Sequence, residues 1–236
     1  MCLILFSVDP TPDCHLVVAA NRDEQHGRAT AAASFWSDEP KLLAGRDLVA
    51  GGTWLGVTTN GRFAAVTNFA EVPADPLPPK SRGLLTTNFL NSETKCEDYL
   101  DSIDREADLF RGFNLLISDG TETWYYSNQS KQKQRLEAGS YGLSNQLLDC
   151  DWPKVGSGRT CLEKLLGSQE NQKIPWSVSH QLFGLLADQG DATPHSARFI
   201  LGDTYGTSVS TVMMQHGKQT LFEERRFNPA GNEVGR

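Results

Sequence analysis

The order of strand-forming and helix-forming segments is the feature that most restricts the fold of this chain. Strand-like runs at 2–8 and 15–20 flank an Asp-Pro-Thr-Pro-Asp cluster, which predicts an opening hairpin. Two further strand-like runs, at 51–57 and 63–67, are joined by an Asn-Gly pair. Because Asn-Gly between two strands is the strongest short-range hairpin signal, a second hairpin is expected there.

The rest of the chain continues with pairs of helices and pairs of strands. We predict helices over 82–90, 95–107, 157–167 and 176–188, strands over 113–118, 122–127, 141–145, 208–214 and 219–227, and a proline-rich loop over 72–79. This order differs from the strand–helix alternation that produces a parallel sheet. It fits an α+β fold in which antiparallel sheets are covered by helices on their outer faces.

Length and charge limit the organisation and the partners. The 236 residues, of which 39% are hydrophobic and 22% charged, fit one domain spanning 1–236 that buries its own core. A formal net charge of -7, with no local stripe of Lys and Arg, argues against nucleic acid as a partner. Neither a signal peptide nor an 18-residue apolar stretch is apparent, so we expect a cytoplasmic protein without a transmembrane segment.

The cysteines and histidines do not form a metal-binding pattern. The five cysteines are scattered without a CxxC pair, which fits reduced thiols in a reducing compartment. The five histidines show neither HxxxH nor HExxH spacing. We therefore predict no metal site and no cofactor.

Cys2 is the first candidate for chemistry. It follows Met1, and its side chain is small enough for an aminopeptidase to remove that methionine. The exposed α-amine would titrate near pH 8 and could accept the thiol proton of the same residue. The alternative is that Met-Cys is a chance start and that Cys2 is a small buried hydrophobe.

The second candidate is the run Ala-Ala-Asn-Arg-Asp-Glu at 19–24, directly after the second predicted strand. Charged residues at the end of a buried strand are poorly suited to packing and well suited to a site. Asp23 could hold the Cys2 ammonium group, and Arg22 could hold a carboxylate or a thiolate. The alternative is a solvated turn in which these residues form an internal ion pair.

The combination of Met-Cys and Ala-Ala-Asn-Arg-Asp-Glu resembles the NRDE family of transport and Golgi organisation protein 2-like proteins. Further motifs match in order and span essentially the whole chain. They are Arg28, Phe35-Trp36, Leu43 to Asp47, Gly51 to Gly56, Ala65 to Asn68, Gly83, Gly112 to Leu115, Tyr141 to Asn145, Trp152 to Lys154 and Phe222 to Phe227.

This family is in turn similar to N-terminal-nucleophile (Ntn) hydrolases of the penicillin V acylase and bile salt hydrolase group. The resemblance implies a four-layer αββα sandwich and a reactive Cys2, with Asp23 in an N-x-D turn binding its amine. It also implies that Asn68 and Asn145 are the side-chain donors of an oxyanion hole. Donors of this kind contribute about 3 to 4 kcal/mol to transition-state stabilisation.

Two positions depart from the family patterns. The hydrolases usually carry an arginine where this chain has Ala20, and NRDE relatives often carry one where it has Ser208. Arg22, two residues after Ala20, would point to the same side of a strand and could substitute. Arg198 is close in sequence to Ser208, but nothing in the sequence assigns it the missing role.

The Gly-Gly-Thr-Trp-Leu-Gly signature at 51–56 has a structural interpretation. Gly51 and Gly52 permit a bulge or a close backbone approach, and Trp54 packs on the sheet. The alternative is that Trp54 lines a pocket. Together with Asn21 and Arg22 of the Asn-Arg-Asp motif, Trp54 is therefore taken as a candidate substrate-binding residue.

Two functional hypotheses follow. The first is a hydrolase or acyltransferase in which Cys2 attacks a linear amide or an acyl thioester. The second, also implied by the resemblance, is a non-catalytic binding or carrier protein for acyl-CoA, lipid or haem that uses the same pocket. In both, the partner is a small molecule.

Overall fold

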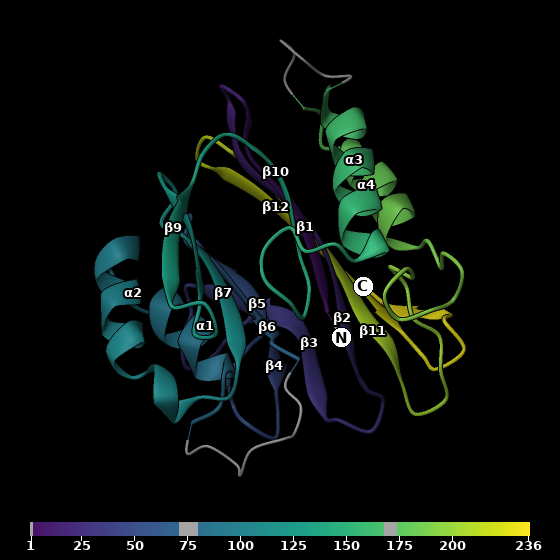
Figure 1. The fold of residues 1–236 in the computed structure, drawn as a ribbon, viewed down its shortest axis with the longest axis horizontal. Helices are drawn as coiled ribbons and strands as arrows, with labels where there is room; N and C mark the ends of the chain where they lie inside the picture. The colour runs from purple at the N-terminus through teal and green to yellow at the C-terminus, as the bar shows by residue number, and fades with distance from the viewer. Residues whose placement is uncertain (1, 71–79, 168–173) are drawn as a thin grey trace. The chain divides into compact units, whose positions relative to one another are not determined.

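The computed structural model describes residues 2–70, 80–167 and 174–236, and the chain forms two compact units (Figure 1). The first unit contains Met1–Gly27, Glu137–Ser144 and Leu148–Arg236, and the second contains Arg28–Leu136 and Asn145–Leu147. The proline-rich loop predicted over 72–79 lies outside the described residues. The single domain predicted from the sequence stays a prediction.

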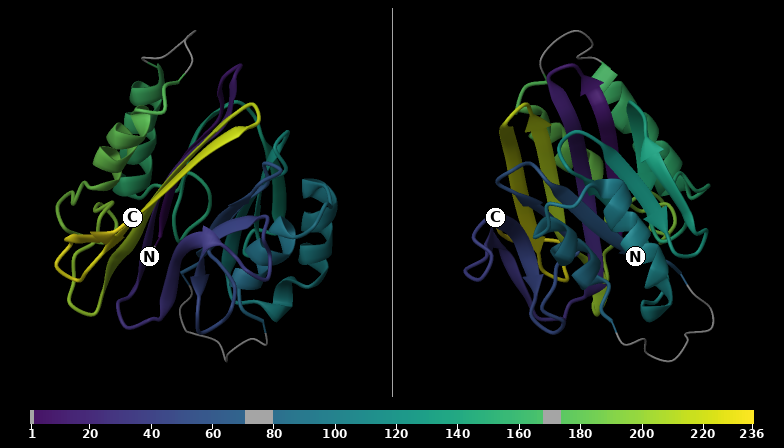
Figure 2. Two further views of the ribbon diagram at one scale, coloured as in Figure 1. Left: turned by 180° about the vertical axis from the view of Figure 1, so that it is seen from behind. Right: turned by 90° about the vertical axis from the view of Figure 1, so that its left-hand side faces the viewer.

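The first unit is built on a six-stranded antiparallel sheet with the order β10-β1-β2-β11-β12-β13 among its described residues. Its strands are β1 (Leu3–Thr11), β2 (Cys14–Gln25), β10 (Gly139–Leu143), β11 (Tyr205–His216), β12 (Gln219–Phe227) and β13 (Glu233–Gly235). The predicted opening and closing hairpins are confirmed. They lie side by side because β2 pairs with β11 along most of its length (Figure 2).

Two helices, α3 (Pro153–Gly167) and α4 (Val178–Leu186), cover one face of this sheet (Figure 1). The strands alternate, so that every second side chain enters the core under the helices. Helix α3 begins earlier than predicted, because proline is well tolerated in the first turn of a helix. The core includes Leu3, Leu5, Val17, Ala19, Val155, Leu162, Leu182, Leu186, Val212 and Met214.

The second unit has a seven-stranded antiparallel sheet whose described strands follow one another in chain order from β3 to β9. They are β3 (Thr30–Phe35), β4 (Leu42–Asp47), β5 (Leu55–Thr58), β6 (Phe63–Asn68), β7 (Phe113–Ser118), β8 (Thr123–Ser127) and β9 (Gln132–Leu136). Helices α1 (Gly83–Leu90) and α2 (Cys96–Arg105) pack on this sheet, and a short 3₁₀ helix (Ala107–Leu109) follows. The α+β class with antiparallel sheets is confirmed.

The Gly-Gly-Thr-Trp-Leu-Gly signature has the close backbone approach that the sequence predicts. A Cβ atom on Gly52 would lie 2.6 Å from the carbonyl carbon of Gly83, so the start of α1 packs directly on the Gly52 backbone. Trp54 is partly buried and packs against the core of the second unit. Its carbonyl oxygen accepts a 2.8 Å hydrogen bond from the backbone nitrogen of Val66.

Replacing Gly52 by alanine is expected to lower the free energy of unfolding by about 1 to 3 kcal/mol, because the new methyl group would meet backbone atoms that cannot move independently. The control is Gly184→Ala in α4, where a Cβ atom has open space. That change should stabilise the helix by up to about 1 kcal/mol. Urea unfolding measures both values, and equal effects would contradict the packing described.

Candidate functional site

The Asn-Arg-Asp motif lies inside β2, so the N-x-D turn and the strand end predicted at residue 20 are wrong. Strand β2 continues to Gln25 and pairs with β11, with Asn21 opposite Ser210, Arg22 opposite Val209 and Asp23 opposite Thr207. This pairing satisfies the backbone groups, so polar residues can continue the strand in the interior.

Cys2 directly precedes β1 at the same end of the sheet. Leu3 pairs with Asn21, which brings Cys2 next to Arg22 and Asp23. The Ser144 hydroxyl, just after β10, donates a 2.6 Å hydrogen bond to the Cys2 carbonyl oxygen. The residue is partly exposed, and this bond holds its backbone to the end of β10.

The Cys2 thiol is not ionised by its surroundings alone. Burial raises its pKa, and the negative charge of Asp23 adds to that effect. A backbone hydrogen bond from Asp23 and the charge of Arg22 act in the opposite direction. Since the net shift is upward, nucleophilic attack would require a base close to the thiol.

Asp23 is only 4% exposed and uses one carboxylate oxygen within the sheet. Thr207 Oγ1 donates a 2.7 Å hydrogen bond to Asp23 Oδ1, and Asp23 Oδ2 has no hydrogen-bond partner in the described part of the chain. Burial raises the pKa of Asp23 to about 6, although the charge of the N-terminal amine, the Thr207 hydrogen bond and the charge of Lys154 act to lower it. A buried carboxylate oxygen without a donor is costly, which makes it a candidate binding point for an amine.

Arg22 forms the internal ion pair that the sequence offered as an alternative. Its guanidinium lies 3.2 Å from Glu24, two residues along the same strand, and both side chains therefore lie on the face of Ala20. The Ser208 hydroxyl donates to the Arg22 carbonyl oxygen at 3.2 Å. Part of the Arg22 charge is thus balanced by a neighbour before any ligand binds.

The Arg198 side chain binds residues at the end of α4. Its guanidinium pairs with Asp188 and donates to the Leu185 carbonyl oxygen at 2.9 Å and to Ser157 at 3.0 Å. These partners engage each of the three guanidinium nitrogens. The structure therefore gives no support to Arg198 as a substitute for the arginine replaced by Ser208.

Asn21 ties three elements of the first unit together. Its amide nitrogen donates to the carbonyl oxygens of Leu186 at 3.0 Å and Arg198 at 2.7 Å, and its side-chain oxygen accepts from Ser210 at 2.6 Å. A side chain with these three bonds holds β2 to β11 and to the end of α4. A role for Asn21 in substrate binding stays a prediction.

Lys154 is a site residue that our sequence analysis matched to the family pattern without giving it a role. It lies in the first turn of α3, its side chain is fully buried, and its Nζ has no hydrogen-bond partner among the residues described. Its charge is coupled to the carboxylate of Asp23 and to the thiols of Cys2 and Cys150. One sequence signal could have indicated its burial. Gly158 follows four residues later, so the two residues share a helix face, and a glycine on that face suits close packing on the sheet.

The two predicted oxyanion donors meet within the second unit. Asn68 is the last residue of β6 and is exposed, whereas Asn145 is buried. Asn145 Nδ2 donates a 2.7 Å hydrogen bond to the Asn68 carbonyl oxygen, and the Asn145 carbonyl accepts from the backbone of Ala70 at 2.8 Å. The segment around Asn145 is therefore held along the end of β6.

Asn114, a buried residue on β7, supports the same segment. Its amide nitrogen donates to Thr67 Oγ1 at 3.1 Å and to the Gln146 carbonyl oxygen at 2.9 Å, while Tyr125 donates to its side-chain oxygen at 2.8 Å. Sequence analysis matched Asn114 to the family pattern without a role. In the structure, its hydrogen bonds connect β6 to the residues after Ser144.

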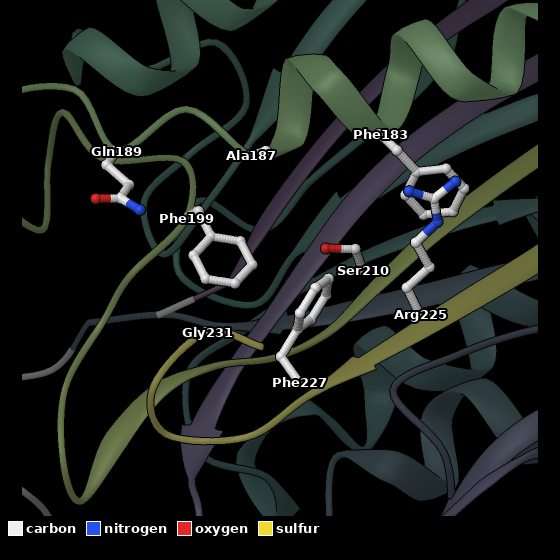
Figure 3. A pocket seen from close by; sticks show the side chains of 8 residues that line it. All are labelled: Phe183, Ala187, Gln189, Phe199, Ser210, Arg225, Phe227 and Gly231. Atoms are coloured by element: carbon white, nitrogen blue, oxygen red, sulfur yellow. The ribbon is translucent and has the colours of Figure 1, made fainter. Parts of the chain in front are cut away.

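A cavity of about 180 Å³ lies in the first unit between α4 and the closing strands (Figure 3). The Arg225 guanidinium lies 3.8 Å from the centre of the Phe183 ring, and the Phe199 and Phe227 rings meet edge to face with centres 4.9 Å apart. Ser210, which binds Asn21, forms part of the wall. The volume is below the roughly 300 Å³ at which pockets for drug-sized ligands begin.

In residues 2–70, 80–167 and 174–236, no three His, Cys, Asp or Glu side chains cluster so as to hold a metal ion. None of the helices over the same ranges has the length and apolar character needed to cross a membrane.

Comparison with known proteins decides the family. The family model described as "Transport and Golgi organisation 2" matches residues 1–229. The chain belongs to the transport and Golgi organisation 2 family. A Mus musculus homologue is 32% identical over 246 residues, covering 91% of this chain and 88% of its own, and a Bos taurus homologue is 38% identical over 219 residues, covering 87% and 78%.

Two solved structures share the fold of this transport and Golgi organisation 2 member. The Caenorhabditis elegans N-acylethanolamine-hydrolyzing acid amidase ortholog superposes with a TM-score of 0.58 at 9% identity, covering 90% of this chain and 92% of its own. A mutant of the Clostridium perfringens conjugated bile acid hydrolase gives 0.54 at 9% identity, covering 100% and 97%. The Ntn-hydrolase-like fold predicted from the sequence is thereby confirmed, and at such low identity the likeness shows the fold alone.

The raised pKa of Asp23 makes a prediction about stability. Between about pH 4 and pH 6 the folded protein keeps a proton on Asp23 that the unfolded chain has lost, so lowering the pH through 6 should stabilise the wild type. Relative to Asp23→Asn, we expect a gain of about 1 to 3 kcal/mol in the free energy of unfolding between pH 8 and pH 4. Denaturant unfolding at each pH measures this difference.

The control is Asp203→Asn at an exposed position, whose stability curve should run parallel to that of the wild type. A constant difference between wild type and Asp23→Asn over the whole range would contradict the buried, proton-binding Asp23.

Proposed function

We propose that this member of the family is an N-terminal cysteine hydrolase or acyltransferase that cleaves linear amides or acyl thioesters after Met1 has been removed. The observation that carries the proposal is the buried Asp23 carboxylate beside Cys2, with Oδ2 lacking a partner among the described residues. The similarity of the fold to two solved hydrolases also supports the proposal, although less specifically.

The α-amine of a first-residue Cys2 would answer two needs of this site. As an ammonium it would satisfy the oxygen of Asp23 that otherwise has no donor. As a neutral amine it would be the base that the raised pKa of the thiol requires. One group on one residue therefore supplies both the missing donor and the missing base.

The proposed reaction proceeds in two stages. The α-amine takes the thiol proton, the sulfur attacks the carbonyl carbon, and the carbonyl electron pair moves onto oxygen. As the carbonyl re-forms, the C–N or C–S bond to the leaving group breaks, and the leaving group takes the proton from the ammonium. Water, or an acceptor amine or alcohol, then attacks the Cys2 thioester with the amine again as base, which releases the acyl product and restores the thiol.

Asn68 and Asn145 are proposed as the oxyanion donors on the strength of the resemblance. Their hydrogen-bonded pairing within the second unit supports the view that they act together. Arg22 and Trp54 stay candidate substrate contacts. Because the two solved hydrolases are named for N-acylethanolamines and conjugated bile acids, fatty-acyl amides and conjugated acids are the first substrates to try.

The five free cysteines fit a reducing compartment, and we place the activity in the cytoplasm on that ground.

Replacing Cys2 by alanine is expected to lower kcat/KM for any substrate found by at least about a thousandfold, because the nucleophile is lost. The matched control is Cys161→Ala, at an exposed thiol on α3, which should keep wild-type turnover. A panel of fatty-acyl amides, conjugated acids and acyl thioesters, followed by product mass, measures both. Full turnover by Cys2→Ala would sink the proposal.

The oxyanion assignment has its own test. We expect Asn145→Ala and Asn68→Ala to lower kcat by about 100- to 1,000-fold with little change in KM, because the donors act mainly in the transition state. Asn91→Ala, at an exposed helix end of the same unit, should leave kcat unchanged. Thermal unfolding checks that each variant is folded, and a folded Asn145→Ala with wild-type kcat would contradict the assignment.

The binding or carrier hypothesis predicts a different result in the same panel. The cavity near Arg225 combines three phenylalanine rings with a cation, which fits a small amphipathic anion. The residues that line this cavity include neither Cys2 nor Asp23, so its volume of about 180 Å³ does not decide between the two hypotheses. Tight binding of acyl-CoA or haem that survives Cys2→Ala, with no product formed, would favour the carrier.

A further inference from the structure

Lys154 and Asp23 are two buried groups of opposite charge, each with an unsatisfied polar atom. The Lys154 side chain is fully buried, and its Nζ has no hydrogen-bond partner over the described ranges of the chain. Asp23 Oδ2 is also buried and also has no hydrogen-bond partner among the described residues. Lysine is rarely buried unless it is paired, and an unpaired buried cation destabilises a fold.

The packing of α3 prevents Lys154 from reaching water. Its backbone nitrogen donates to the His195 carbonyl oxygen at 3.0 Å. The next residue, Val155, packs so closely on β10 that a Cβ atom on Gly142 would lie 2.8 Å from Val155 Cγ1. The Trp152 ring, 5.6 Å from Nζ, is a weak partner at this distance. The helix start therefore keeps the ammonium inside, on the face of the sheet that carries Asn21 and Asp23.

The other cations near the motif are already engaged. Arg22 pairs with Glu24, and Arg198 pairs with Asp188. Lys154 is coupled electrostatically to Asp23, Cys2 and Cys150, and Asp23 is the carboxylate among them. Burial lowers the pKa of Lys154, and the charge of Asp23 opposes that shift. Helix α3 thus brings a second cation, Lys154, into the surroundings of Asp23, in addition to the N-terminal amine.

We propose that Lys154 is the positioning residue of this site, whose positive charge balances Asp23 and favours the thiolate of Cys2, in place of arginines at positions 20 and 208. Its effect on catalysis rests on the proposed function. Without Lys154, the charge of Asp23 would disfavour the thiolate and would hold the proton on the α-amine more tightly. A nearby cation does the opposite to both groups.

The first test follows the alkylation rate of Cys2 by iodoacetamide from pH 6 to pH 10 in untagged protein, with the modified residue mapped by mass. Lys154→Met should react about tenfold more slowly at pH 7 and reach the wild-type plateau at high pH, a shift of about one unit in the apparent pKa. Lys154→Arg keeps the charge and should stay within about threefold of the wild type. Lys164→Met, at an exposed position on the same helix, should match the wild type.

The second readout does not depend on catalysis. The carboxyl ¹³C signal of Asp23 should titrate at a higher pH in Lys154→Met than in the wild type, because the carboxylate has lost its counter-charge. If the Asp23 and Cys2 midpoints are both unchanged in a folded Lys154→Met protein, the inference is wrong. A shifted Asp23 midpoint with a wild-type Cys2 no faster than the other cysteines would overturn the proposed function and leave the Lys154–Asp23 coupling standing.

Thermal unfolding separates this role from a structural one. Methionine is apolar and of similar length, so Lys154→Met should unfold at the same or a higher temperature than the wild type. A lower unfolding temperature together with unchanged midpoints in both Lys154→Met and Lys154→Gln would show that the lysine only supports packing.

Discussion

The pairing of β2 with β11 is the interaction on which the rest of the first unit depends. It joins the beginning of the chain to its end, since residues 14–25 lie against residues 205–216. It also continues past the apolar part of β2 and carries Asn21, Arg22 and Asp23 into the sheet. The neighbours that this pairing supplies, Ser210 and Thr207, provide hydroxyl groups for Asn21 and Asp23. A strand interior is thereby able to hold polar side chains in fixed positions.

Burial of those side chains sets the electrostatic problem of the site. A carboxylate, a thiol and an ammonium group are enclosed near one another. Burial raises the pKa of the first two and lowers that of the third, so it favours the neutral form of each group. Mutual attraction between Asp23 and Lys154 opposes that tendency. Because these interactions act in opposite directions on neighbouring groups, the protonation state of Cys2 should be sensitive to single substitutions at the site.

Much of the fold could be predicted from the sequence, because hairpins are encoded by local turn chemistry. The Asn-Gly turn before β6 and the turn around Gly217 both lie where predicted. Strand β13 was also not predicted, and strands β3, β4 and β9 were missed for physical reasons. β3 is rich in alanine, β4 contains Gly45 and charged residues, and β9 buries only Leu136, so none shows the pattern of a half-buried strand.

The candidate site was only partly predictable. Cys2 and Asp23 stood out because a reactive residue type and a charged run occurred where packing would favour neither. Lys154 did not stand out, since a lysine in a helix is usually exposed and only the tertiary packing of α3 shows that it is buried. The continuation of β2 through Asp23 could not be predicted either, because it depends on partners in β11 that are remote in sequence.

The most direct measurement is the intact mass of untagged protein before and after brief treatment with limiting iodoacetamide. Our account predicts that Met1 is absent and that one fast alkylation maps to Cys2, ahead of the other four thiols. Retention of Met1, or a Cys2 no more reactive than the remaining cysteines, would contradict an N-terminal nucleophile paired with Asp23.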